Sequence, residues 1–135
     1  MNESTGILFV HAFPADASMW DAQKTAFMDR KVVAPSLPGF GFSFRPHQPR
    51  LNRFAMADLF AALMTEVLGY QRFAAQGGDI GAQVTMRLAA AHPDHLYGIH
   101  LNFIALRDLN PGNPTDEERQ YFEELQHWLT EETGY

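Results

Sequence analysis

QGGDIG, residues 76–81, is the part of this sequence that decides its fold. It follows a short apolar run at 72–76, which predicts a buried strand, and it precedes a helical segment expected at about 82–91. Glycine on both sides of Asp79 permits a sharp turn and lets the helix pack close to the strand. A strand, a sharp turn and a helix in this order place Asp79 at the carboxyl end of the strand.

Three further apolar runs, at 6–13, 31–37 and 97–103, are too short for helices and predict strands. Helical segments lie between them at 16–28 and 56–67, and the second has apolar residues at the i, i+3, i+4, i+7 spacing. Strands that alternate with helices predict an α/β fold, a three-layer sandwich with a mainly parallel sheet and right-handed crossovers. This pattern alone also fits a flavodoxin-like or Rossmann-like sandwich.

The character of the chain changes after Phe103. A turn-rich stretch at 109–114 precedes Thr115 and Glu118, which have the spacing of a capping box for a last helix. An apolar stripe on that helix consists of Tyr121, Phe122, Leu125, Trp128 and Leu129. Such stripes usually pack against a domain, so we favour packing over ligand binding for it. We expect a core domain at 1–105 and a separate helical region at 106–135.

Composition limits the function. The chain has 135 residues, 46% of them hydrophobic, and a formal net charge of −6, which predicts a globular protein and argues against nucleic acid as a partner. No apolar run reaches the roughly 18 residues of a membrane span, and no secretion signal is visible, so we expect a cytoplasmic protein.

Metal and cofactor sites are not expected. The sequence has 0 Cys, and its 6 His have no ligand-like spacing such as His-x-x-x-His. The Gly-x-Gly at 39–41 follows a proline and lacks the third glycine of a dinucleotide-binding loop.

Asp79 is the candidate nucleophile. A carboxylate at this turn would form an alkyl ester with a substrate, whereas a serine would form an acyl enzyme. The competing interpretation is an aspartate that only caps the following helix. A second motif, His11-Ala12-Phe13-Pro14, favours the first interpretation because it follows the first predicted strand.

These motifs resemble the catalytic core of the α/β-hydrolase superfamily, which carries His-Gly-x-Pro after an early strand. The resemblance implies that the backbone N–H groups of Phe13 and Ile80 form an oxyanion hole. It also implies that His11, Pro14, Gly78 and Gly81 shape the loops around Asp79.

From about residue 72 onward the chain is similar to microsomal-type epoxide hydrolases. The stretches that carry this similarity are QGGD at 76–79, GIHLNF at 98–103 and EETGY at 131–135. The last resembles the family's Glu-Ser-Gly-Tyr at the start of the cap domain. The similarity implies that Asp79 is the nucleophile, that Tyr135 is one of two cap tyrosines that hydrogen-bond the epoxide oxygen, and that the substrate is a small apolar epoxide.

Several positions depart from the family pattern. Ala12 replaces a glycine, Ser36 an aspartate, and Ile80 a tryptophan whose absence argues against a haloalkane dehalogenase. His100 lies inside a predicted strand, and we expect it to be a buried, hydrogen-bonded core histidine.

In the family the water-activating histidine and its acid partner come after the segment that matches this chain, which corresponds to the third to sixth core strands and the start of the cap. We therefore expect an epoxide-hydrolase-like chain that forms the ester but is incomplete for turnover. The alternative is a non-catalytic, truncated or recombined α/β-hydrolase core that folds as an oligomer. In both cases we expect a homo-oligomer, because a partial sheet leaves edges and apolar surface exposed.

Overall fold

The structure, a computed structural model, describes residues 5–43, 47, 49–103 and 112–131. The chain divides into two compact units, Met1–Ala105 and Leu106–Tyr135. Among the described residues, the first unit contains the sheet and the second contains one helix.

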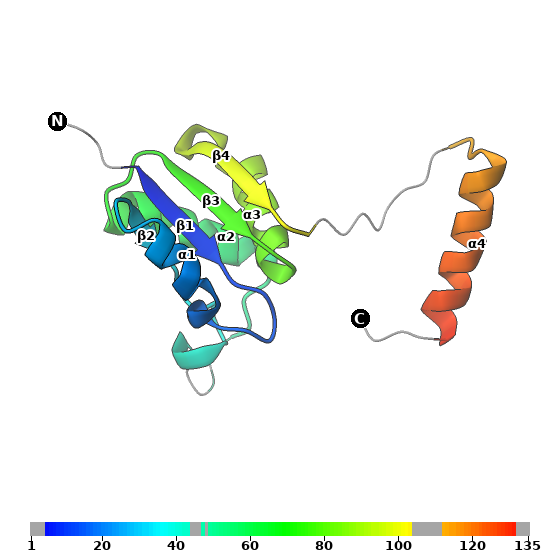
Figure 1. The fold of residues 1–135 in the computed structure, drawn as a ribbon, viewed down its shortest axis with the longest axis horizontal. Coiled ribbons are helices and arrows are strands. Elements are labelled where there is room, and N and C mark those ends of the chain that lie inside the picture. Colours follow the sequence, from blue (N-terminus) through cyan, green and yellow to red (C-terminus); the bar gives the residue numbers. More distant parts are fainter. Residues whose placement is uncertain (1–4, 44–46, 48, 104–111, 132–135) are drawn as a thin grey trace. The chain divides into compact units, whose positions relative to one another are not determined.

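A four-stranded parallel sheet forms the first unit, in the order β2-β1-β3-β4 (Figure 1). The strands are β1 (Gly6–Val10), β2 (Lys31–Val33), β3 (Phe73–Gly77) and β4 (Leu96–Leu101). All four predicted strands are present, although β1, β2 and β4 end earlier than their apolar runs do. The α/β fold with a parallel sheet is confirmed.

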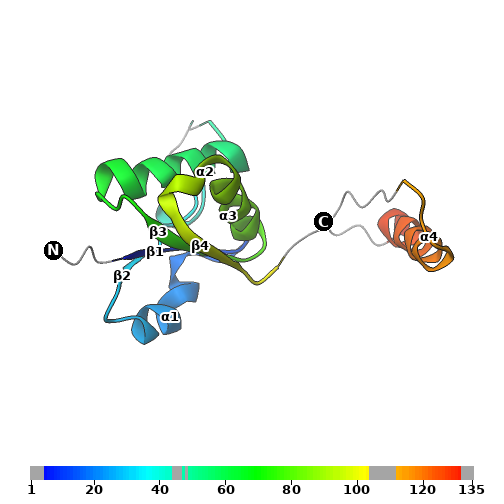
Figure 2. The same cartoon turned by 90° about the horizontal axis from the view of Figure 1, so that it is seen from above.

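Helices cover both faces of the sheet, which confirms the three-layer arrangement (Figure 2). A short helix, α1 (Asp21–Ala26), lies on one face, preceded by a 3-10 turn at Ala17–Trp20. On the other face lie α2 (Arg53–Ala62), which continues as a π-helix at Leu63–Val67, and α3 (Ile80–Ala91). Short 3-10 turns also occur at Gly41–Ser43 and Pro93–His95.

Alternation along β1 divides the core between the two faces. Leu8 and Val10 are fully buried in the main hydrophobic cluster, which includes Phe60 of α2 and Leu88 of α3. Phe9, between them, points to the opposite face and stacks on Trp20 with ring centroids 4.9 Å apart. A strand buried on both faces requires a continuous apolar run, which is the pattern that the sequence shows here.

Local capping explains why α2 begins at Arg53, three residues before the apolar periodicity that starts at Met56. The Asn52 side-chain oxygen accepts hydrogen bonds from the N–H groups of Phe54 and Ala55, both at 3.0 Å. The predicted helix at 16–28 is instead split into the 3-10 turn and α1, because Asp16 caps the turn and Phe27 ends the helix.

The expectation for His100 was wrong, since its side chain is exposed. It lies on β4, which is an edge strand of the described sheet, and α1 lies over the other side of the sheet near β1 and β2. Tyr97 and Ile99 on the same strand are also exposed, at 53% and 38%. Burial of an edge strand depends on neighbours that its own sequence does not encode.

The second unit contains α4 (Asp116–Glu131), and the predicted capping box is confirmed there. The Thr115 hydroxyl accepts a hydrogen bond from the Glu118 N–H at 3.3 Å, and the Glu118 carboxylate accepts one from the Thr115 N–H at 2.7 Å. Three acidic residues in the first turn lie at the positive end of the helix dipole.

Candidate active site

Three loops meet where the parallel strands end. Val10 of β1 pairs with Gly77 of β3, and Gly77 pairs with Leu101 of β4, so the carboxyl ends of these strands are level. The loops that follow them begin with His11, Gly78 and Asn102. In open α/β sheets this edge is the usual place for a ligand site.

Asp79 is held in a strained backbone conformation between β3 and α3. Its φ is 54° and its ψ is −123°, a combination that side-chain-bearing residues rarely adopt. The carbonyl of Asp79 accepts the hydrogen bond from Ala82 N–H at 3.0 Å, so α3 starts directly after the turn. The strained turn places Asp79 at the carboxyl end of β3.

Gly77 and Gly81 make this turn sterically possible. A Cβ on Gly77 would overlap the carbonyl of Gly81, and a Cβ on Gly81 would overlap the carbonyl of Val10. Gly78 differs, because a Cβ there would lie 3.6 Å from Asn102, an ordinary van der Waals distance. The close approaches are therefore at Gly77 and Gly81, and Gly77 was not among the predicted loop-shaping residues.

One oxygen of the Asp79 carboxylate is held by the loop after β1. The Phe13 N–H donates a hydrogen bond to Asp79 Oδ2 at 3.1 Å. The Asp79 side chain makes no hydrogen bond to the start of α3, so the interpretation of this residue as a side-chain helix cap is wrong. The structure brings together Asp79 and Phe13, which are 66 residues apart in the sequence.

Ile80 follows Asp79 as the first residue of α3. The N–H groups of the first helical turn have no acceptor within the helix, so α3 itself supplies no partner for the Ile80 N–H. Its side chain is partly buried against the main core cluster.

His11 ties the loops after β1 and β2 together. Its side chain is fully buried, and Nε2 accepts a hydrogen bond from the Leu37 N–H at 2.8 Å. Nδ1 lies 2.9 Å from the Ala12 carbonyl, so the hydrogen-bond network assigns the proton to Nδ1. Both ring nitrogens are thus engaged in holding loops, and the Phe13–Pro14 peptide bond that follows is cis.

The same loop is fixed at its far end by Asp16. Asp16 Oδ1 accepts a hydrogen bond from the Ser18 N–H at 2.8 Å. The pKa of the Asp16 carboxyl is lowered from its ordinary value of 3.8, mainly by hydrogen bonds from Ser18.

Asn102 is the first residue after β4 and is hydrogen-bonded to the end of β3. Its N–H donates to the Gly77 carbonyl at 3.2 Å, and its side-chain oxygen accepts a hydrogen bond from Gln76 Nε2. Sequence reasoning did not single out Asn102. Its place directly after a predicted strand was the available signal, because the carboxyl ends of parallel strands meet at one edge.

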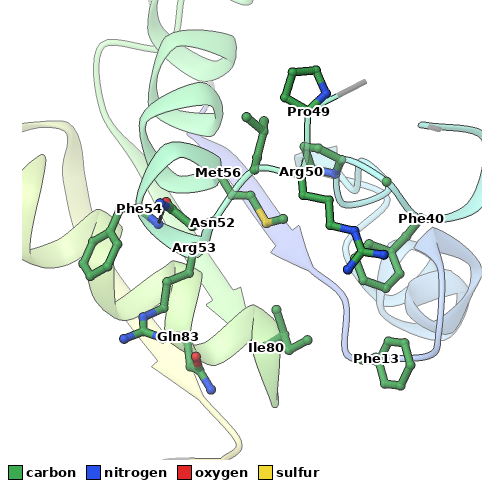
Figure 3. A pocket seen from close by; sticks show the side chains of 13 residues that line it. Phe13, Phe40, Pro49, Arg50, Asn52, Arg53, Phe54, Met56, Ile80 and Gln83 are labelled. Carbon is green, nitrogen blue, oxygen red and sulfur yellow. Dashed lines mark hydrogen bonds between the residues drawn. The ribbon is translucent and has the colours of Figure 1, made fainter. Parts of the chain in front are cut away.

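An open pocket of about 710 Å³ adjoins Phe13 and Ile80 (Figure 3). Its apolar lining includes Phe13, Phe40, Leu51, Met56 and Ile80. Gln83, Arg50 and Arg53 supply polar groups, and the described lining contains no Asp or Glu. A pocket of this size and apolar character is typical of small-molecule sites.

Tyr135 lies outside the described residues. Within the described chain, no three or more His, Asp or Glu side chains are grouped so that they could hold a metal ion. None of the helices that the structure describes has the length and apolar character needed to cross a membrane.

Comparison with known proteins identifies relatives among epoxide hydrolases. The sequence is 43% identical over 111 residues to a proposed epoxide hydrolase of Stigmatella aurantiaca (strain DW4/3-1), an alignment that covers 77% of this chain and 24% of that protein. It is 43% identical over 72 residues to epoxide hydrolase 1 of Oryctolagus cuniculus, covering 53% of this chain and 16% of that protein. The chain therefore spans about a quarter or less of the length of these relatives.

Solved structures agree with this. The Aspergillus niger epoxide hydrolase matches with a TM-score of 0.75 and 25% identity, over 100% of this chain and 38% of that one. Juvenile hormone epoxide hydrolase from the silkworm Bombyx mori matches with a TM-score of 0.65 and 32% identity, over 73% of this chain and 28% of that one. A family model described as alpha/beta hydrolase fold matches residues 6–133. The predicted resemblance to epoxide hydrolases is confirmed, and this chain belongs to the α/β-hydrolase fold family.

Proposed function

We propose that this chain carries the nucleophile of an epoxide-hydrolase-like enzyme, and that Asp79 opens an epoxide to form an alkyl ester. The observation that carries the proposal is the hydrogen bond from the Phe13 N–H to Asp79 Oδ2, made at a strained strand-to-helix turn. That bond orients the carboxylate and leaves Oδ1 as the oxygen that attacks. Strain at such a position is typical of functional sites.

In the first step Asp79 Oδ1 forms a bond to one epoxide carbon while the bond from that carbon to the ring oxygen breaks. The ring oxygen keeps the electron pair and takes a proton. Tyr135 is our candidate proton donor, by its resemblance to a cap tyrosine, and residues 106–135 would then be the start of the cap.

In the second step water would attack the ester carbonyl carbon. Negative charge then develops on Oδ2, where the N–H groups of Phe13 and Ile80 would stabilise it. This step needs a base to activate the water. Among the described histidines none is hydrogen-bonded to Asp79, and His11 uses both nitrogens to hold loops. The 135-residue chain should therefore form the ester with Asp79 and hydrolyse that ester slowly.

The experiment is intact mass spectrometry after exposure to a simple aryl epoxide such as styrene oxide. We expect a mass increase of one substrate molecule per chain, mapped by proteolysis to the peptide that contains Asp79. Asp79→Asn should abolish the label, and Asp58→Asn, which changes an exposed carboxylate on α2, should retain it. Labelling of other carboxylates with Asp79 unmodified would contradict the proposal, and sustained diol release would show that a base is present.

The alternative is a non-catalytic core that folds as an oligomer. The observation in its favour is the exposed apolar side chains on and after β4, since Phe103 is 55% exposed as well as Tyr97 and Ile99. A folded, oligomeric protein that no epoxide labels would support this alternative.

A further inference from the structure

The loop that holds the Asp79 carboxylate is itself held by a methionine. The Ala12 N–H donates a hydrogen bond to the sulfur of Met19, with nitrogen and sulfur 3.4 Å apart. Ala12 directly precedes Phe13, whose N–H donates to Asp79 Oδ2. The donor bonded to the sulfur and the donor bonded to the carboxylate are therefore consecutive amides of one loop.

The backbone of Met19 is fixed on both sides of the residue. Its N–H donates a hydrogen bond to the Asp16 carbonyl at 3.2 Å, within a 3-10 turn that the Asp16 side chain caps. The next residue, Trp20, is 3% exposed and stacks on Phe9. A chemical change at the sulfur must then be taken up by the Met19 side chain or by the loop at Ala12.

Met19 is accessible to an oxidant in solvent. Among the methionines that the structure describes, Met28 is 81% exposed and Met19 is 40% exposed, whereas Met56 and Met64 are buried in the core. The chain has 0 Cys, so no thiol competes for the oxidant. A peroxide should therefore react first with Met28 and Met19.

We propose that Met19 is an oxidation site, and that its conversion to the sulfoxide lowers the reactivity of Asp79. A lone pair of the sulfur attacks one oxygen of hydrogen peroxide, and the O–O bond breaks. The second oxygen leaves as hydroxide and takes the proton of the transferred oxygen, which gives the sulfoxide and water. Methionine sulfoxide reductases reverse this modification. This inference rests on the proposed function, because it gives the Asp79 site a means of regulation.

The new oxygen does not fit into the existing contact. An N–H···O hydrogen bond alone spans about 2.9 Å. An oxygen on the sulfur therefore cannot be inserted into the 3.4 Å between the Ala12 nitrogen and the Met19 sulfur. If the oxygen faces the N–H, the loop and the side chain must move apart. If it faces solvent, the positively polarised sulfur is a poorer acceptor, and the Ala12 N–H loses its partner. In both cases the neighbouring Phe13 N–H is less firmly held against Asp79.

The test measures labelling of Asp79 by styrene oxide before and after a limited treatment with hydrogen peroxide. The peroxide is removed before the epoxide is added, and peptide mapping locates the sulfoxides. Labelling should slow at least about fivefold when Met19 is oxidised, since a misplacement of about 1 Å in a reacting group can cost about a hundredfold in rate. Treatment with methionine sulfoxide reductases should restore the original rate.

Two leucine variants separate Met19 from oxidation elsewhere in the chain. Peroxide should leave the labelling rate of Met19→Leu unchanged, whereas it should slow Met28→Leu as much as the unmodified chain. Circular dichroism checks that both variants fold. Three outcomes would overturn the inference while the proposed function stands: oxidised Met19 with an unchanged rate, equal slowing of Met19→Leu by peroxide, or oxidation of Met28 that leaves Met19 unmodified.

A separate measurement does not depend on the epoxide. If the untreated chain is not labelled at Asp79, the proposed function fails. Heteronuclear NMR then tests whether the sulfur holds the loop. The amide resonances of Ala12 and Phe13 should shift when Met19 is oxidised, and they should stay in place when Met19→Leu is treated with peroxide. Resonances that do not move on oxidation of Met19 would overturn the inference.

Discussion

Asp79 combines two requirements that conflict. Its positive φ places the carboxylate at the end of β3, but it also costs stability, since side-chain-bearing residues in such conformations lose on the order of 1–3 kcal/mol. The structure retains the strain because Gly77, Gly81 and the Phe13 N–H fix the turn from three sides. Residues at functional sites commonly show this opposition between stability and activity.

Replacing Asp79 should reveal that opposition. Asp79→Gly should raise the free energy of unfolding by about 1 kcal/mol because glycine adopts the conformation without steric cost. Asp79→Asn keeps the side-chain shape and should leave the thermal midpoint similar. Both should abolish labelling by epoxides. Thermal and urea unfolding measure the effect, and a large loss of stability in Asp79→Asn would show that the carboxylate is structural.

The glycines around Asp79 give a matched pair of variants. Gly81→Ala should lower the free energy of unfolding by about 2 kcal/mol or more, since its Cβ would meet the Val10 carbonyl and backbone cannot easily move. Gly78→Ala should cost less than about 1 kcal/mol, because Asn102 is at an ordinary contact distance. Urea unfolding of the two variants should show this order, and the reverse order would mean that α3 packs differently on β1.

The resemblance to α/β-hydrolases implied that Phe13 and Asp79 belong to one site, and the hydrogen bond between them agrees with that. It could not distinguish Gly78 from Gly77, because that difference depends on how close α3 approaches β3 and β1. Arg50 and Arg53, which line the pocket, were also missed. They belong to no motif, and they reach the pocket from the residues just before α2 and from its first residue.

At the scale of elements, periodicity predicted the type of each strand and helix but not its ends. The apolar run continues from Gly6 to Phe13, but β1 ends at Val10. His11 begins the loop after the strand, and its buried ring accepts a hydrogen bond from the Leu37 N–H. Apolar character therefore marked neither strand nor burial at the end of this run, since Phe13 is 51% exposed. Capping residues were better guides, as Thr115 and Glu118 show.

The capping box of α4 predicts a pH dependence. The pKa of Glu118 is lowered from its ordinary value of 4.5, mainly by the hydrogen bond from the Thr115 N–H. A lowered pKa means that this contribution to helix stability is present above the unfolded value and is lost as the pH falls through the folded value.

We therefore expect the Thr115 amide resonance to titrate with a midpoint below 4.5, and the N-terminal turn of α4 to fray below it. Heteronuclear NMR between pH 2.5 and 7 measures this, with those limits chosen to span roughly two units below the usual glutamate range. Glu118→Gln should remove the transition, whereas Glu124→Gln, in the middle of α4, should leave it. A midpoint above 4.5 would contradict the capping geometry.

At the scale of the whole molecule, the fold class follows from element order, but the exposure of β4 does not. The prediction for His100 was a buried core histidine inside a strand, whereas the described sheet ends at β4 and leaves His100 exposed. A strand's neighbours are a property of the assembly of elements, so the local sequence around His100 carries no signal for them.

We expect the chain to self-associate. An exposed parallel edge strand with Tyr97 and Ile99 uncovered is a template for pairing, and the apolar stripe of α4 adds Trp128 at 48% exposure. Light scattering at micromolar concentration should report a dimer or a larger oligomer. Ile99→Lys places a charge on the edge strand and should shift the population toward monomer, because a buried unpaired charge at an interface is costly. Val67→Lys, at an exposed residue on the π-helical turn after α2, is the control and should leave the mass unchanged. A monodisperse monomer of the unmodified chain would count against self-association, and would leave the β4 edge to be covered by a different partner.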